Sequence, residues 1–449
     1  MKTSKIAKIL HATLEGQDQE YSGVSIDSRS LKPGNVYIAL KGEQFDGHDF
    51  VEAAAAAGAA AAIVSKPGNY SLPIILVNDT HQALMDWATV YRQQFNIPVI
   101  AITGSCGKTT TRAITDSILS LVGPTLASQG SFNNNIGVPL TILQLTPQHQ
   151  FLVQEVGANH PGEIAELMKI LKPTISVVTC VAPVHLEGFG SIEGVAAAKG
   201  EIYEGLGPEG VAIVNADQPY YAFQSDFWKT RKDPSFHPKD FGQRGPAHIE
   251  AQNIHLDQSA RARFELCMGS EKTEVQLQLI GEHNVTNALA AAAIAEACHV
   301  PLTVIKEGLE NAKAEKMRLQ AKSGIKSSQI IDDSYNANPI AMLAALKVLS
   351  HHAEPRVFVV GDMRELGPDA ERYHSELGQQ AKEHNVHSLY CYGPLSKSAA
   401  ESFGENAHWF ENIAELINNL QECLQPGSTI LVKGSRSMGM DRVVKALVL

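Results

Sequence analysis

The stretch Val99–Thr111, VIAITGSCGKTTT, decides the fold of this chain. A β-branched run leads into a glycine turn, and a lysine and three threonines follow where a helix should begin. In such a phosphate loop, backbone N–H groups face phosphate oxygens, Lys108 neutralises them and the Thr109 hydroxyl holds Mg²⁺. Position 102 is Ile, so the usual Walker spacing is shortened to the loop Gly104–Gly107. A glycine turn without a ligand is the alternative, but Lys-Thr-Thr directly after the turn favours a bound nucleotide.

The composition indicates a protein of several domains with little affinity for nucleic acid. The chain has 449 residues, enough for two to four domains of roughly 100–200 residues each. It carries 48 acidic and 37 basic residues, so its formal net charge of −11 argues against a nucleic-acid surface. The 6 cysteines lack C-x-x-C spacing and are interpreted as reduced thiols of a cytosolic protein.

No targeting segment is recognised in the sequence. Residues 1–16 lack the continuous apolar core and the cleavage site of a secretory signal. The alanine-rich stretch 53–62 is too short and too weakly apolar to span a bilayer. We therefore expect a cytoplasmic protein without membrane insertion.

Strands and helices alternate along the chain, which predicts an α/β protein. Residues 1–95 form a small α/β unit in which 50–62 is expected to be an alanine-rich helix. After Pro98, the strand, helix and strand pattern predicts a parallel sheet with right-handed crossovers. A β-rich excursion is expected over residues 218–278, and a third unit of α/β character begins near Glu315.

Polar side chains follow the central strands at the edge where the phosphate loop lies. Glu155 ends the strand FLVQEV, where it could face a metal ion or be a solvated charge. His185 follows another strand, where it is either a metal ligand or a structural histidine. Lys199 lies among alanines on a helix. It is either a surface lysine paired with Tyr203, which the residues alone favour, or a buried amine able to react with CO₂.

Three polar loops are further candidates. The loop SFNNNIGVP carries the consecutive amides Asn133, Asn134 and Asn135, which suit a peptide or sugar substrate but equally suit an Asx-capped turn. In the first unit, the turn 27–29 and the loop 41–49 could hold an anionic ligand such as a diphosphate, or be ordinary turns.

The chain resembles the Mur ligases of peptidoglycan synthesis from about residue 22 to residue 445. The resemblance rests on motifs that occur in this order: GSCGKTTT, FNNNIGVP, EVGANHPGEI, HLEGFGS, AAAKGEIY, HNVTNALAA, MRLQ, DDSYNANP and GDMRELG. The phosphate loop is specific only for the superfamily. DDSYNANP with GDMRELG is typical of the member that adds a terminal dipeptide.

The resemblance implies three domains and one reaction. Residues 1–95 would bind a UDP-sugar, residues 96–314 would be a central P-loop ATPase with a parallel sheet, and residues 315–449 would be Rossmann-like and bind the incoming dipeptide. The implied reaction is ATP-dependent ligation of D-alanyl-D-alanine to UDP-N-acetylmuramoyl-tripeptide through an acyl phosphate, with release of ADP and phosphate. ATP, two Mg²⁺ ions and a carbamate formed from CO₂ on Lys199 are implied, in a cytoplasmic monomer.

The resemblance also assigns roles to individual residues. Catalytic roles fall to Lys108, His185 and Lys199. ATP would contact Gly104, Ser105, Cys106, Gly107, Lys108, Thr109, Thr110, His283, Asn287, Arg318 and Asp333. The metal ions would be held by Thr109, Glu155, His185 and Lys199. The two substrates would contact Ser28, Arg29, His48, Asn133, Asn134, Asn135, Asn338, Lys433, Ser435 and Arg436.

Two other functions are compatible with the sequence. One is a related ligase, either another Mur-type enzyme or a folylpolyglutamate-type synthase. The other is a P-loop phosphotransferase that transfers phosphate without ligation. Whether the tripeptide carries diaminopimelate or lysine is not determined by the sequence.

Overall fold

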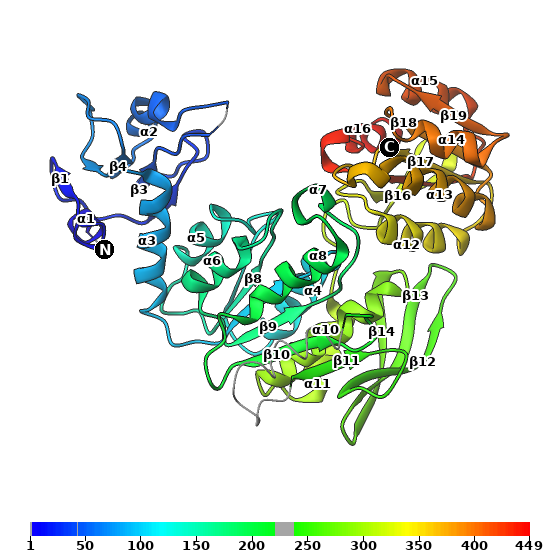
Figure 1. Ribbon diagram of the computed structural model, residues 1–449, viewed down its shortest axis with the longest axis horizontal. Coiled ribbons are helices and arrows are strands. Elements are labelled where there is room, and N and C mark those ends of the chain that lie inside the picture. The colour runs from blue at the N-terminus through cyan, green and yellow to red at the C-terminus, as the bar shows by residue number, and fades with distance from the viewer. Residues whose placement is uncertain (1, 43, 221–237) are drawn as a thin grey trace.

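The computed structural model describes residues 2–42, 44–220 and 238–449. Within these residues the chain forms three sheets, one after another, each with its own helices (Figure 1). This confirms the predicted α/β class with three units. Part of the expected β-rich excursion, residues 221–237, lies outside the described residues. None of the described helices is both long enough and apolar enough to cross a bilayer.

The N-terminal unit is built on a five-stranded sheet in the order β1-β5-β4-β3-β2. Its elements are α1 (Thr3–Ile9), β1 (Thr13–Glu15), β2 (Gly23–Ser25), β3 (Asn35–Ile38), α2 (Val51–Ala56), β4 (Ala61–Val64), β5 (Ile74–Leu76) and α3 (Thr80–Arg92). The helix expected over 50–62 is wrong in its second half. The chain turns at Gly58, whose φ of +87° ends the helix, and the next alanines pair in β4 between β3 and β5.

The central unit has a nine-stranded sheet in the order β14-β13-β12-β11-β10-β9-β6-β8-β7. The strands are β6 (Val99–Thr103), β7 (Thr125–Ala127), β8 (Phe151–Glu155), β9 (Ile175–Val178), β10 (Val211–Asn215), β11 (Lys239–Gly242), β12 (Ile249–Leu256), β13 (Arg261–Met268) and β14 (Glu271–Ile280). From β12 through β11, β10, β9, β6 and β8 to β7, neighbouring strands pair in parallel, as predicted. Strands β12, β13 and β14 form an antiparallel meander. The meander is the β-rich excursion that the sequence indicates.

Helices cover both faces of the central sheet. They are α4 (Lys108–Leu119), α5 (Gly137–Ile142), α6 (Glu163–Leu171), α7 (Leu186–Phe189), α8 (Ile192–Gly200), α10 (His283–Ala297) and α11 (Leu302–Asn311). Strand β6 alternates between the two cores: Val99 and Ala101 face one, and Ile100 and Ile102 face the other. The alanine-rich α10 packs against α4, which carries the phosphate-loop residues Lys108 and Thr109. The helix that follows the loop is therefore packed against a buried helix.

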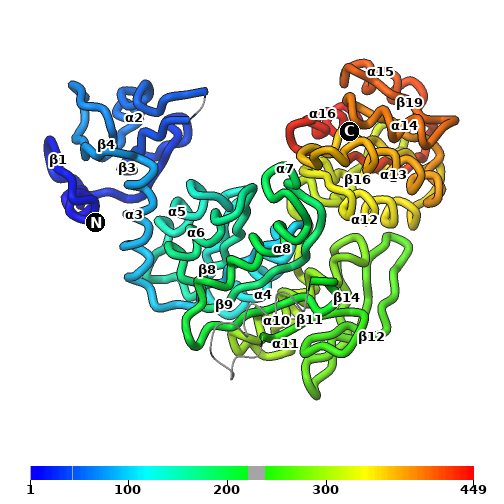
Figure 2. Tube along the Cα trace, in the orientation of Figure 1, coloured from blue at the N-terminus to red at the C-terminus, as the bar shows by residue number. Residues whose placement is uncertain are grey.

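The C-terminal unit has a six-stranded sheet in the order β15-β16-β20-β17-β18-β19, parallel except for β15. Its strands are β15 (Gln320–Ser323), β16 (Gln329–Asp333), β17 (Arg356–Gly361), β18 (Ser388–Tyr392), β19 (Ala407–Phe410) and β20 (Thr429–Lys433). Its helices are α12 (Pro339–Ser350), α13 (Ala370–Glu383), α14 (Lys397–Phe403), α15 (Ile413–Cys423) and α16 (Asp441–Leu447). The trace in Figure 2 places the two outer units on opposite flanks of the central one, with α7 near the C-terminal unit.

Candidate active site

The phosphate loop between β6 and α4 has the backbone that only glycine accommodates. Gly104 has a φ of +146° and Gly107 a φ of +83°. A Cβ at Gly104 would clash with Thr179 Oγ1, and one at Gly107 would clash with Asn287 Oδ1. Both glycines are therefore required, by conformation and by space. The turn presents its N–H groups together with the N-terminus of α4, which is an anion-binding arrangement.

Side chains with oxygen atoms that could bind a metal ion lie next to the loop. Thr109 Oγ1 donates a hydrogen bond to Glu155 Oε2 at 2.8 Å, and Asn133 Nδ2 donates to Glu155 Oε1 at 2.8 Å. Glu155, at the end of β8, is buried with 3% of its surface exposed. Lys108 Nζ donates to the Gly104 carbonyl at 2.7 Å, so its ammonium lies over the loop. A hydroxyl and a carboxylate in contact suit a divalent cation that prefers oxygen ligands.

A cavity of about 370 Å³ lies over the loop, between the central and C-terminal units. Its wall brings together most of the residues that the sequence singles out. They are Gly104, Ser105, Cys106, Gly107, Lys108, Thr109, Thr110, Asn133, Asn134, Glu155, His185, Lys199, His283, Asn287, Arg318, Asp333, Asn338 and Lys433.

Lys199 is buried on α8, with 1% of its surface exposed. Its Nζ lies 5.3 Å from the centre of the Phe189 ring. The surface position that the residues alone favoured is therefore wrong, and the expected partner Tyr203 instead donates its hydroxyl to the Ile213 carbonyl at 2.8 Å. Burial, with a smaller contribution from Lys108, lowers the pKa of Lys199 to about 7. A substantial fraction of this amine is neutral at neutral pH, which is the form that reacts with CO₂.

His185 directly precedes α7 and contacts the C-terminal unit. Its Nδ1 lies within hydrogen-bond distance of Glu365 Oε2, and the Leu186 N–H donates to the Glu365 carbonyl at 3.1 Å. Burial lowers the pKa of His185, and the nearby Glu365 carboxylate acts in the opposite direction. In the described ranges, no three His, Cys, Asp or Glu side chains converge closely enough to hold a metal ion by themselves. A metal at this edge therefore needs oxygens from hydroxyls, phosphates or a modified lysine.

Side chains of the C-terminal unit complete the cavity. Arg318 Nη2 donates to Thr109 Oγ1 at 3.1 Å, and its guanidinium lies 4.2 Å from the centre of the Tyr335 ring. Lys433 Nζ and Asp333 Oδ2 form a buried ion pair at 2.6 Å. Tyr335 was not among the residues predicted from the sequence, although it stands inside the motif DDSYNANP two residues after Asp333. The pairing places Lys433 beside Asp333 on the wall of the cavity.

The three asparagines of the loop SFNNNIGVP differ in their contacts. Asn133 binds Glu155, whereas Asn134 Oδ1 accepts hydrogen bonds from the N–H groups of Ile136 at 3.2 Å and Gly137 at 2.9 Å. The contacts of Asn134 are those of an Asx turn, which was the alternative to a substrate-binding role for this loop. Asn135 is exposed and does not line the cavity.

Ser435 and Arg436 lie outside the cavity wall, in the loop that follows β20. Ser435 Oγ accepts a hydrogen bond from the Arg364 N–H at 2.9 Å, so this loop contacts the loop GDMRELG after the neighbouring strand β17. The Arg436 side chain is largely exposed. The two strand-end loops therefore form one surface at the carboxyl edge of the C-terminal sheet, which is where ligands bind in such sheets.

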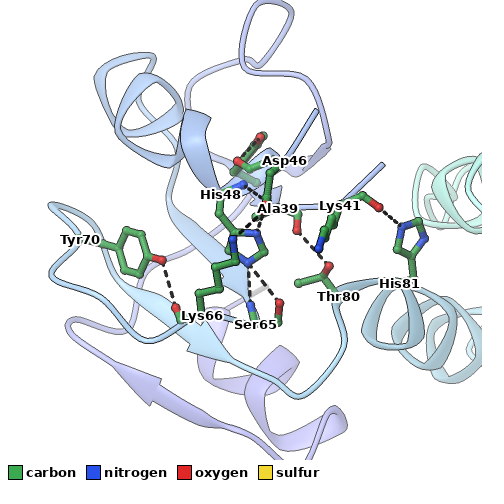
Figure 3. Close-up of polar contacts among 11 residues, drawn as sticks. Ala39, Lys41, Asp46, His48, Ser65, Lys66, Tyr70, Thr80 and His81 are labelled. Atoms are coloured by element: carbon green, nitrogen blue, oxygen red, sulfur yellow. Dashed lines mark hydrogen bonds and ion pairs between the residues drawn. The ribbon is translucent and has the colours of Figure 1, made fainter. Parts of the chain in front are cut away.

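In the N-terminal unit, His48 belongs to a closed polar cluster (Figure 3). Its Nδ1 lies 2.6 Å from Asp46 Oδ1, and its Nε2 accepts the Ser65 N–H at 2.9 Å. Lys66 pairs with Asp46 Oδ2 at 2.6 Å and, with His48, holds the pKa of that carboxyl well below its usual range. Both ring nitrogens of His48 are thus engaged within the unit.

The other two residues predicted in the N-terminal unit lie in the turn after β2. The Arg29 guanidinium pairs with Asp27 at 2.7 Å, and 88% of the Arg29 side chain is exposed. Ser28 is half-buried beside them. This turn is remote from the cavity at the phosphate loop, whose wall contains no residue of the first 100.

Three family models match consecutive parts of the chain. They are described as "Mur ligase family, catalytic domain" over residues 20–108, "Mur ligase middle domain" over residues 102–295 and "Mur ligase, glutamate ligase domain" over residues 317–436.

Curated relatives and solved structures match nearly the whole chain. It is 42% identical over 446 residues to the UDP-N-acetylmuramoyl-tripeptide--D-alanyl-D-alanine ligase of Escherichia coli (strain K12), covering 99% of this chain and 97% of that protein. The ligase of the same name from Bacillus subtilis (strain 168) is 34% identical, with coverage of 99% and 97%. Among structures, MurF from Acinetobacter baumannii has a TM-score of 0.89 at 34% identity, with coverage of 98% and 97%. MurF ligase from Thermotoga maritima in complex with ADP has a TM-score of 0.81 at 26% identity, with coverage of 94% and 96%.

Proposed function

This chain belongs to the Mur ligase family, and from that premise we propose that it joins D-alanyl-D-alanine to UDP-N-acetylmuramoyl-tripeptide, using ATP. The observation that carries the proposal is the 42% identity over 99% of the chain to a ligase of that name. The reaction belongs to the cytoplasmic stage of peptidoglycan synthesis, where ATP and nucleotide sugars are available. The chemistry at the phosphate-loop edge suits it, because a ligase of this type must bind ATP and an acid together.

ATP supplies the phosphoryl group that turns the tripeptide carboxylate into an acyl phosphate, and the dipeptide amine then displaces phosphate. The residues of this chain hold and neutralise the groups involved. Lys108, which lies over the loop, and the loop N–H groups would bind the phosphates. Arg318, which donates to Thr109 Oγ1, would reach the same phosphates from the C-terminal unit. The cavity is lined from both units, so their contact also excludes water that would hydrolyse the acyl phosphate.

We propose two metal positions at this edge of the sheet. Thr109 and Glu155 would hold one Mg²⁺, since their oxygens already lie in contact. His185 and a carbamate on Lys199 would hold the second. A buried, partly neutral amine on the cavity wall supports the carbamate, which would convert a cation into a carboxylate-like metal ligand.

The remaining roles are proposed by unit. His283 and Asn287 would face the adenine end of ATP, and Asp333 the ribose. Residues 1–95 would bind the UDP-sugar and residues 315–449 the dipeptide, with 96–314 as the ATPase. In the C-terminal unit, the strand-end surface around Ser435 is the proposed position of D-alanyl-D-alanine.

The test is an assay of amine-dependent phosphate release. The protein is incubated with ATP and UDP-N-acetylmuramoyl-tripeptide, carrying either diaminopimelate or lysine, together with D-alanyl-D-alanine, D-alanine or no amine. We expect phosphate release and a ligated product only with the dipeptide. Release without an amine would indicate a phosphotransferase, and preference for a single amino acid would indicate another ligase of the family.

A further inference from the structure

Two thiols meet at the phosphate loop. Cys106 lies in the loop itself, and Cys180 lies 74 residues further along, just after β9. The Cys106 N–H donates to Cys180 Sγ at 3.2 Å, and the Cys180 thiol donates to the Cys106 carbonyl at 3.5 Å. Both cysteines are free.

The surroundings make the two thiols unequal. The Cys180 thiol, together with Asn338 and the cations Lys108 and Lys433, lowers the pKa of Cys106, and the same contact raises the pKa of Cys180. Asn338 Nδ2 donates to Cys106 Sγ at 3.1 Å. Cys106 is thus the better nucleophile of the pair, and Cys180 is placed to react with it afterwards. Cys106 lines the cavity, which is the route by which a small oxidant would approach it.

We propose that Cys106 and Cys180 form a reversible disulfide when the protein meets a peroxide, and that this disulfide prevents the phosphate loop from binding a nucleotide. In the first step the Cys106 thiolate attacks a peroxide oxygen, the O–O bond breaks, and Cys106 becomes a sulfenic acid. In the second step the Cys180 sulfur attacks the Cys106 sulfur, the S–O bond breaks and water leaves. Overall, two thiols and one hydrogen peroxide give one disulfide and two waters.

The consequence for the loop follows from the contacts. The Cys106 N–H is one of the loop donors that should face phosphate oxygens, and it now points at Cys180 Sγ. A disulfide would hold that sulfur in place, so the N–H could not turn toward a phosphate. It would also remove the thiol hydrogen bond to Asn338 Oδ1, which links the loop to the C-terminal unit. Nucleotide binding and contact between the units would be weakened together.

The test compares the whole reduced protein before and after hydrogen peroxide. We expect a mass decrease of two hydrogens, a cross-linked peptide pair containing Cys106 and Cys180, and loss of binding of a fluorescent ATP analogue. Dithiothreitol should restore both the mass and the binding. Cys180→Ser should give no cross-link, and its Cys106 should proceed to a sulfinic acid that dithiothreitol does not reduce. Cys423→Ser is the matched control, because it removes an exposed thiol on α15 and should behave like the wild type.

Two results would overturn the inference. One is a peroxide-treated protein in which both thiols stay free while Cys423 is oxidised. The other is a protein that forms the cross-link but binds the ATP analogue with unchanged affinity. The effect of the disulfide on ligation rests on the proposed function, but the measurements of mass and nucleotide binding do not. Failure of the ligation assay with intact disulfide chemistry would therefore refute only the proposed function.

Discussion

The phosphate-loop edge and the polar cluster of the N-terminal unit satisfy their charged groups in opposite ways. At the loop, Arg318 reaches Thr109 and Glu365 reaches His185, so partners 209 and 180 residues apart meet between two units. In the N-terminal cluster, His48 and Lys66 pair with Asp46 over only 2 and 20 residues, within one unit.

The difference shows what each set of contacts can do. Contacts between units break when the units separate, and a ligand can replace them. Contacts within a unit stabilise its loops and are not available for exchange. We therefore expect substitutions at the loop to affect turnover, and substitutions in the N-terminal cluster to affect stability and substrate positioning.

The largest expected effect is that of Lys108→Ala. Removing the ammonium that faces the phosphates should reduce phosphate release by at least about 10²-fold, because charge on the transferring group is no longer neutralised. Steady-state phosphate release measures it. Lys445→Ala, which removes an exposed lysine on α16, is the control and should be unchanged. Normal turnover in Lys108→Ala would mean that the nucleotide binds elsewhere.

Lys199→Ala should also abolish ligation, but in a rescuable way. If a carbamate on this buried amine holds a metal, acetate or formate added to the variant should restore part of the activity. Product formation is measured against carboxylate concentration, with Lys169→Ala on the exposed side of α6 as control. Full activity of Lys199→Ala in buffer free of CO₂ would exclude the carbamate role.

Arg318→Ala tests the contact between units and should have a smaller effect. Losing one charged hydrogen bond to the loop should lower kcat/KM for ATP about 10- to 100-fold, since such bonds contribute about 1.5–3 kcal/mol. Arg372→Ala, on the exposed face of α13, should leave kinetics unchanged. An unaffected Arg318→Ala enzyme would show that the C-terminal unit does not act on ATP through this residue.

His48→Ala should act on stability rather than on turnover. The substitution leaves the half-buried Ser65 N–H without its acceptor, and Asp46 Oδ1 loses the ring nitrogen but keeps the backbone N–H of residue 48. This should cost about 1–3 kcal/mol of unfolding free energy. Urea unfolding measures the loss, and KM for the UDP-linked substrate should rise at constant kcat. His160→Ala, an exposed histidine, is the control. A fall in kcat with unchanged stability would place His48 in direct contact with substrate.

Lys199 should also make the stability of the protein depend on pH. Its pKa is about 7 in the folded protein and about 10.5 unfolded, so between these values the unfolded chain binds more protons. The unfolding free energy of the wild type, relative to Lys199→Met, should therefore rise from pH 7 to pH 10 and stay constant below pH 7. Chemical unfolding in buffer free of CO₂ measures this, and a flat difference would mean that the lysine is not protonated on unfolding.

Local features were predicted well because their causes are local. The strand before the phosphate loop and the helix that begins at Lys108 lie where the sequence predicts them, since a β-branched run that leads into a glycine turn needs no distant partner to be recognised. The prediction of a helix over 50–62 was wrong in its second half because alanine is compatible with both helix and strand. Pairing with β3 and β5 makes residues 61–64 a strand.

The sequence by itself determined the phosphate loop, because Gly104 and Gly107 supply the positive φ angles that the turn needs and Lys-Thr-Thr has one common chemical use. Through its motifs it also determined the family. Only the tertiary structure decided that Lys199 is buried, that Asn134 caps a turn and that both nitrogens of His48 are engaged. Burial and hydrogen-bond partners depend on which elements pack together. The contact of Cys106 with Cys180 follows the same rule, because it exists only where β9 brings a distant thiol to the loop.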